Sequence, residues 1–200
     1  MEDEFWPQLK GGIDRFLSEM NQLWQLRDEA WQLSTGSGAV EPVGDATEEF
    51  LGRFWDILKE ITALEGDGIR DFQDKADGLL AKATDDVATM FHEIAEDVIK
   101  DLRKRIEQKS RGLLFFGNLR EASKQLRLAE QAFNQAAAMK DGGDARKSID
   151  TYRDSIEKSR EGVQEVVAVG LGGRGNQIMI LLTLTALVVA AISLVVAFVR

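Results

Sequence analysis

The feature that most constrains this chain is an uninterrupted apolar run at residues 178–199. It reads IMILLTLTALVVAAISLVVAFV and holds no charged residue, proline or glycine. A helix of this length rises about 33 Å, which is enough to cross a hydrocarbon core of about 30 Å. We therefore expect residues 176–200 to form one transmembrane helix, preceded by a Gly-rich hinge at 170–175. A buried core helix would instead need several apolar partner helices, whereas the other helices of this chain are amphipathic.

The position of this run predicts the topology. Only Arg200 follows it, and the N-terminal MEDEFWPQLK is acidic and shows no signal-peptide pattern. We therefore expect a tail-anchored, single-pass membrane protein whose N-terminal bulk is cytoplasmic. Arg174 and Arg200 flank the run and nearly cancel, so the positive-inside rule adds little to this expectation.

Composition limits what residues 1–169 can be. The full chain has a net charge of -9, two prolines and no cysteine, which fits one helical domain with its own core and leaves the redox compartment open. The acidic balance argues against nucleic acid as a partner. It also argues against broad electrostatic attachment to anionic lipid, because like charges repel.

Apolar residues recur at three- and four-residue steps almost throughout residues 1–169, which predicts an all-α fold. We expect an elongated helical bundle, similar to a coiled coil, because the third helix would be about 60 Å long. The stretch STGSGAVEPVGD predicts a loop at 34–45. Asn118, with Glu121 three residues later, resembles a capping box at the start of the fourth helix. The helices are expected at about 8–34, 46–65, 68–110, 118–140 and 145–169.

The last hairpin, at 126–160, carries a local family resemblance. Its residues GGDARKSIDTYRDSIE resemble the turn and second helix of a tetratricopeptide repeat, at Gly143, Asp144, Ser148, Ile149, Tyr152, Ser155 and Ile156. In that family small residues let paired helices approach closely, and Ala136 would serve in this way on the first helix. Ala132 stands where the family usually has an aromatic residue, and no second copy follows. The resemblance implies a peptide-binding adaptor at a membrane surface, and an ordinary αα-hairpin is the alternative.

Catalytic chemistry has little support in the sequence. His92 is the only histidine and lies one turn from Glu96, but no His-x-x-x-His or Glu-x-x-His pair supplies further metal ligands. We interpret it as an ordinary surface histidine. The chain also has no cysteine nucleophile, no nucleophile elbow and no phosphate-binding P-loop. We therefore expect no enzyme activity, no metal and no cofactor.

A first candidate site is the turn between the third and fourth helices, where four large apolar residues follow one another: Leu113, Leu114, Phe115 and Phe116. If the helix at 145–169 ends at the bilayer, its antiparallel neighbour begins there, and this turn faces lipid. Arg111 and Arg120 flank the turn, as headgroup contacts require. The turn therefore either enters the membrane interface or plugs the end of the bundle core.

A second candidate site lies within the apolar run itself. Small residues recur at spacings of three and four along one seam of the helix, at Thr183, Ala186, Ala190, Ser193 and Ala197. Small side chains allow the close approach that drives helix association in lipid. This seam is a candidate for packing against a second copy or against another transmembrane helix.

Taken together, these patterns favour a scaffold or adaptor whose bundle recruits or tethers a protein partner at a membrane surface. The alternative is a membrane-active effector that oligomerises and remodels or permeabilises the bilayer. A lone uncharged span makes a poor aqueous pore, which favours the scaffold. The expected partners are the lipid bilayer and a protein, with self-association through the transmembrane helix or the bundle left open.

Overall fold

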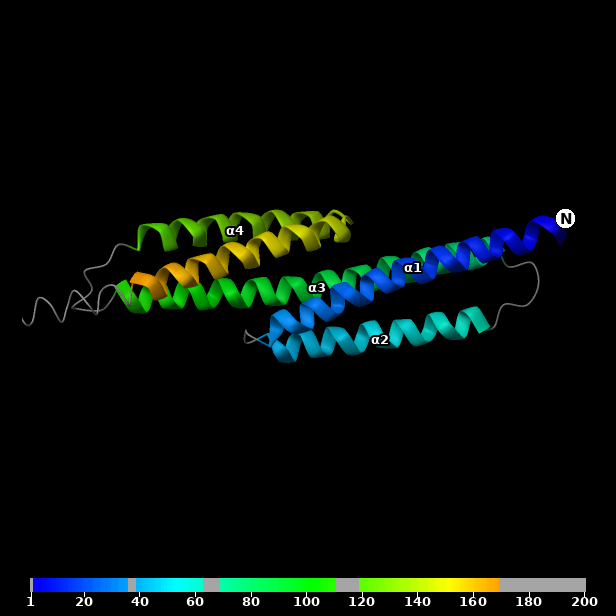
Figure 1. Ribbon diagram of the computed structural model, residues 1–200, viewed down its shortest axis with the longest axis horizontal. Coiled ribbons are helices and arrows are strands. Elements are labelled where there is room, and N and C mark those ends of the chain that lie inside the picture. Colours follow the sequence, from blue (N-terminus) through cyan, green and yellow to red (C-terminus); the bar gives the residue numbers. More distant parts are fainter. Residues whose placement is uncertain (1, 36–38, 63–68, 111–118, 170–200) are drawn as a thin grey trace, which may run out of the picture.

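The computed structural model of the protein describes residues 2–35, 39–62, 69–110 and 119–169, and nearly all of them are helical. The helices are α1 (Glu2–Ser34), α2 (Val40–Thr62), α3 (Ile69–Ser110), α4 (Arg120–Asp141) and a further helix at 145–169 (Figure 1). These described residues include no strand. The all-α bundle predicted from the apolar periodicity is confirmed.

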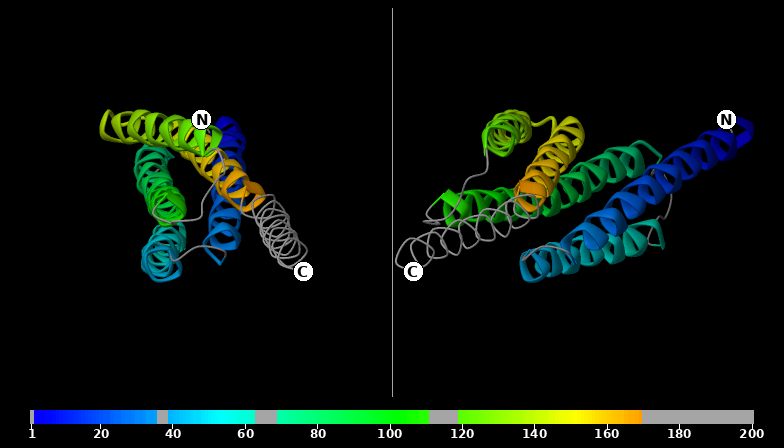
Figure 2. Two further views of the ribbon diagram at one scale, coloured as in Figure 1. Left: turned by 90° about the vertical axis from the view of Figure 1, so that its left-hand side faces the viewer. Right: turned by 60° about the vertical axis from the view of Figure 1, so that its left-hand side comes forward.

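Helix α3 is the long central helix against which the other described helices pack. Its 42 residues rise about 63 Å. Helices α1 and α2 form an antiparallel pair along its N-terminal half, and α4 and the 145–169 helix form a second pair along its C-terminal half (Figures 1 and 2). Because α2 and α4 lie on opposite sides of α3, this helix is covered from more than one direction. Within the described ranges, the middle of α3 is deeply buried, with Val87, Met90, Phe91 and Ile94 fully buried.

The two helix pairs share one main core. It joins Phe16 and Leu23 of α1 and Phe50 of α2, through the middle of α3, to Ile149 and Tyr152 of the 145–169 helix. A smaller apolar group lies further along α3 and is built on Leu102, Ala122 and Val166. The bundle therefore has a continuous interior and a separate apolar end.

Three helix starts differ from the sequence expectation. Helix α1 begins at Glu2 instead of near residue 8. Helix α2 begins at Val40, so much of the stretch expected as a loop is helical. Burial of Ala39 and Val43 favours this, and Pro42 fits because the first helical turn has no use for its missing N–H. Helix α4 begins at Arg120 with Leu119 as its N-cap, which forms no side-chain capping hydrogen bond. Asn118, from which the capping box was expected, lies outside the described residues.

The α4 hairpin is closely packed because its facing positions are small. Every seventh residue on the inner face of α4 is a buried alanine: Ala122, Ala129 and Ala136. Every seventh residue on the facing helix is also small and buried: Ser148, Ser155 and Gly162. The Ser155 hydroxyl donates across the pair to the Ala129 carbonyl oxygen at 2.8 Å. Gly143, with φ of +83°, forms the turn in the left-handed region that glycine adopts without cost.

In the described ranges, no helix is both long and apolar enough to span a bilayer. The expected hinge at 170–175 and the expected transmembrane helix at 176–200 lie outside the described residues.

Candidate partner-binding surfaces

A stripe of large apolar side chains is exposed along α1. Leu17, Trp24 and Trp31 are 52%, 38% and 39% exposed. Their spacing of seven residues is close to two helical turns, so all three lie on one side of the helix. We call these three residues the α1 stripe. Each of them directly follows a core residue, and the stripe therefore flanks the buried seam of α1.

Trp24, at the centre of the stripe, is held in place by its neighbours. Its ring lies 5.9 Å from the ring of Phe50 on α2, centroid to centroid. The Arg27 guanidinium carbon lies 4.9 Å from the Trp24 ring centroid, in cation–π geometry. A ring that is supported on one side and open on the other loses little freedom when a partner covers it. Such aromatic residues are typical binding hot spots.

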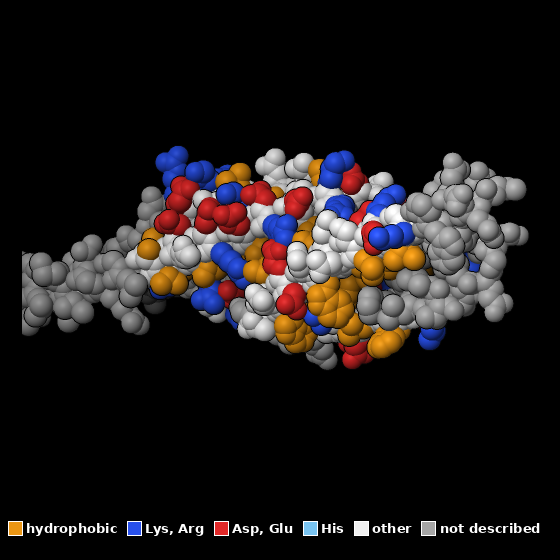
Figure 3. Space-filling view, turned by 45° about the vertical axis from the view of Figure 1, so that its right-hand side comes forward, with side chains coloured by type: hydrophobic (Ala, Val, Ile, Leu, Met, Phe, Trp, Pro, Cys, Tyr) orange, Lys and Arg blue, Asp and Glu red, His pale blue; other side chains and the backbone are white. Residues whose placement is uncertain are grey.

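The neighbouring helix adds a second exposed tryptophan. Trp55 on α2 is 61% exposed, more than any residue of the α1 stripe. Figure 3 shows hydrophobic side chains gathered on the half of the molecule that α1 and α2 build. Elsewhere among the described residues, the exposed large apolar side chains are Leu128 on α4 and Val167 on the 145–169 helix. The α1–α2 hairpin is therefore the most apolar surface that the structure describes.

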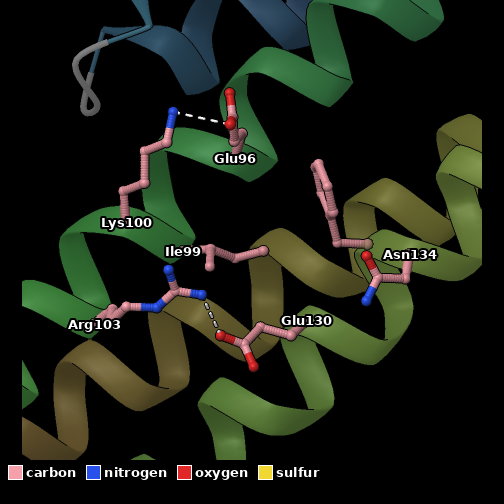
Figure 4. A pocket seen from close by; sticks show the side chains of 7 residues that line it. Glu96, Ile99, Lys100, Arg103, Glu130 and Asn134 are labelled. Atoms are coloured by element: carbon pink, nitrogen blue, oxygen red, sulfur yellow. Dashed lines mark hydrogen bonds and ion pairs between the residues drawn. The ribbon is translucent and has the colours of Figure 1, made fainter.

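A second candidate surface is a cleft between α3 and α4 with a volume of about 360 Å³. Ile99 and Phe133 line it, and two ion pairs, Lys100 with Glu96 at 2.9 Å and Arg103 with Glu130 at 2.6 Å, lie at its rim (Figure 4). Because each cation already has a carboxylate partner, the cleft offers no unbalanced charge to an ionic ligand. Exposed ion pairs of this kind contribute at most about 1 kcal/mol each. Their side chains can therefore rearrange to fit different ligands, but they give the cleft little selectivity among ligands.

His92 is not an ordinary surface histidine. It is half-buried, and its Nδ1 lies 2.9 Å from the hydroxyl of Tyr152. Its ring centroid lies 4.8 Å from that of Phe133. Burial, with smaller effects from Asp141 and Asp85, raises the pKa of Tyr152 to about 12, so the phenol stays protonated at neutral pH. The arrangement ties three helices together.

Metal binding finds no support at this histidine. Within the part of the chain that the structure describes, no three or more His, Asp or Glu side chains are grouped as ligands. The role of His92 could not be predicted from local sequence, because its hydrogen-bond partner is 60 residues away.

The two sites expected from the sequence lie outside the described residues. These are the apolar turn, Leu113, Leu114, Phe115 and Phe116, and the small-residue seam, Thr183, Ala186, Ala190, Ser193 and Ala197. Both stay predictions. The α1 stripe was missed, although its seven-residue spacing was a signal that could have found it.

Comparison with known proteins adds no assignment. No protein-family model matches the chain, and neither a curated protein nor a solved structure matches it. The likeness of 142–157 to a tetratricopeptide repeat stays a local resemblance in the sequence.

Proposed function

We propose that this protein is a membrane-tethered interaction scaffold. Residues 176–200 anchor it in a bilayer, and the helical bundle presents the α1 stripe to a protein partner. The observation that carries the proposal is the stripe itself, in which Leu17, Trp24 and Trp31 are exposed at heptad spacing on a helix whose other apolar face is buried.

The spacing of the stripe suggests what kind of partner it receives. Apolar residues every seven positions match the seam of an amphipathic helix laid alongside α1. Charge makes the preference more specific, because residues 2–35 and 39–62 carry thirteen Asp or Glu and only five Lys or Arg. A partner helix with an apolar seam and basic flanks therefore fits this surface best.

The test compares two variants of the full-length chain in membranes. Trp24→Ala with Trp31→Ala removes most of the stripe, and Leu128→Ala is the matched control, because Leu128 has a similar exposure of 39% on a different helix. Each form is solubilised in mild detergent, and the proteins that come with it are quantified by mass spectrometry.

We expect one partner to be retained by wild type and Leu128→Ala and to fall at least about tenfold with the double variant. Loss of two hot-spot tryptophans is worth more than about 2 kcal/mol, which is above the 1.4 kcal/mol that corresponds to tenfold. Equal helicity of the three forms excludes unfolding as the cause. Identical sets of bound proteins in all three forms would overturn the proposal. Dye release from vesicles by the full chain would instead favour the effector that permeabilises the bilayer.

A further inference from the structure

Three helix ends meet at one end of the bundle. The C-terminal end of α3, the N-terminal end of α4 and the C-terminal end of the 145–169 helix lie together there (Figure 1). The Arg103–Glu130 ion pair fixes one level across α3 and α4, and the hydrogen bond from Ser155 to Ala129 fixes nearly the same level on the third helix. We call the part beyond this level, residues 103–110, 119–130 and 156–169, the anchor-proximal end.

The anchor-proximal end is basic, although the chain as a whole is acidic. It carries nine Lys or Arg against six Asp or Glu, whereas the remaining described residues carry thirteen against twenty-six. The net charge of -9 is therefore unevenly distributed along the bundle: positive charge is in excess at the anchor-proximal end, and negative charge is in excess over the other described residues. The helix dipoles do not cancel it, because two helix C-termini and one N-terminus together contribute only about half a negative charge.

The basic side chains at this end are accessible to a ligand. They include Lys104, Arg105, Lys124 and Arg127, all of which are exposed. Across the described residues, neither Lys104 nor Arg127 has a carboxylate within ion-pair distance. Arg105 and Lys124 pair with carboxylates on their own helices, and such exposed pairs exchange readily for another anion.

The chain path places this end close to the expected bilayer. Only residues 170–175 separate the 145–169 helix from the apolar segment that begins at 176. Six residues span at most about 20 Å, so the anchor-proximal end stays within roughly two Debye lengths of the headgroups. The acidic α1–α2 hairpin lies toward the other end of α3 (Figure 2).

We propose that the anchor-proximal end docks on anionic lipid headgroups, so that the bundle stands end-on with its acidic α1–α2 hairpin directed away from the membrane. This inference rests on the proposed anchoring by residues 176–200. Attraction at one end and repulsion at the other both favour the same orientation, which overall charge does not reveal. The α1 stripe is then held out from the bilayer, where a partner in solution can reach it.

The test uses the full-length chain in vesicles and exploits its lack of cysteine. A single dye is attached at Gln108→Cys, in the anchor-proximal end, or at Gln73→Cys, which is about 52 Å away on the same helix. Energy transfer to a headgroup-labelled lipid is measured in phosphatidylcholine vesicles and in vesicles with about 30% phosphatidylserine.

We expect transfer from position 108 to rise at least about twofold in the anionic vesicles and to return to the neutral level in about 0.5 M salt, with position 73 unchanged. Lys104→Glu with Arg127→Glu should abolish the rise. Lys10→Glu with Lys82→Glu, an equal charge change on exposed residues of the other part of the bundle, should leave it intact.

Two failures are distinguishable. Equal transfer from position 108 in both vesicle types, with the protein still floating with phosphatidylcholine vesicles, would overturn the docking and leave the anchoring in place. A chain that does not float with phosphatidylcholine vesicles would overturn the anchoring, and this inference with it.

Discussion

Gly162 of the 145–169 helix packs against Leu102 of α3, and replacing it with alanine tests the packing of the second helix pair. A Cβ atom added there would lie 2.6 Å from Leu102 Cδ2 and 3.3 Å from the Cβ of Gln125. Leu102 is fully buried, so its side chain must shift within the packed interior before the added Cβ atom can fit. Overpacking of this kind costs about 1–3 kcal/mol, and alanine recovers up to about 1 kcal/mol through its better helix propensity. We therefore expect Gly162→Ala to lose about 1 kcal/mol of stability.

Gly78 provides the matched control. It lies in the interior of α3, it is exposed, and nothing lies within 4 Å of a Cβ built on it. Gly78→Ala should therefore gain about 0.5–1 kcal/mol, which is the opposite sign. The assay is thermal unfolding of the full-length chain in mild detergent, followed by circular dichroism, where 1 kcal/mol shifts the Tm by about 2–4 °C.

Repeating the Gly162→Ala substitution in a Leu102→Ala background distinguishes overpacking from other causes of lost stability. With Leu102→Ala in place, the clashing Cδ atoms are absent and only the 3.3 Å approach to Gln125 Cβ remains, so Gly162→Ala should be much less destabilising. If Gly162→Ala melted as high as Gly78→Ala in the original background, the close approach of the 145–169 helix to α3 would be refuted.

Two further predictions concern buried polar contacts. Burial raises the pKa of Asp86, and the hydrogen bond from Arg53 offsets only part of this effect. The folded chain therefore holds this proton more tightly than the unfolded chain, and the contribution to stability falls as the pH rises from about 3.8 through the raised folded value. Asp86→Asn should remove that part of the slope of Tm against pH, and an unchanged slope would count against it. Tyr152→Phe should cost about 1 kcal/mol in thermal unfolding by removing the hydroxyl beside His92, and less in a His92→Ala background. Equal costs in the two backgrounds would argue against this hydrogen bond.

The helices could be predicted from the sequence because a helix that buries one face leaves a periodic apolar signal along the chain. Local signals failed where tertiary burial opposed them. The composition of 34–45 favours a loop, yet Ala39 and Val43 are buried and α2 begins at Val40. The His92–Tyr152 hydrogen bond and the Gly162 contact join residues that are 60 positions apart along the chain. No local pattern reports such pairs.

The α1 stripe shows why surface function is harder to predict than the core. Helix α1 carries two adjacent apolar rows of the same seven-residue spacing, one beginning at Phe16 and the other at Leu17. Periodicity alone predicts burial equally well for either row. The packing of the other helices decides between them, because it buries the Phe16 row and leaves the α1 stripe partly exposed. An amphipathic helix whose apolar face is wider than its own bundle covers has room for one more helix, and that is the kind of partner that the proposed scaffold would recruit.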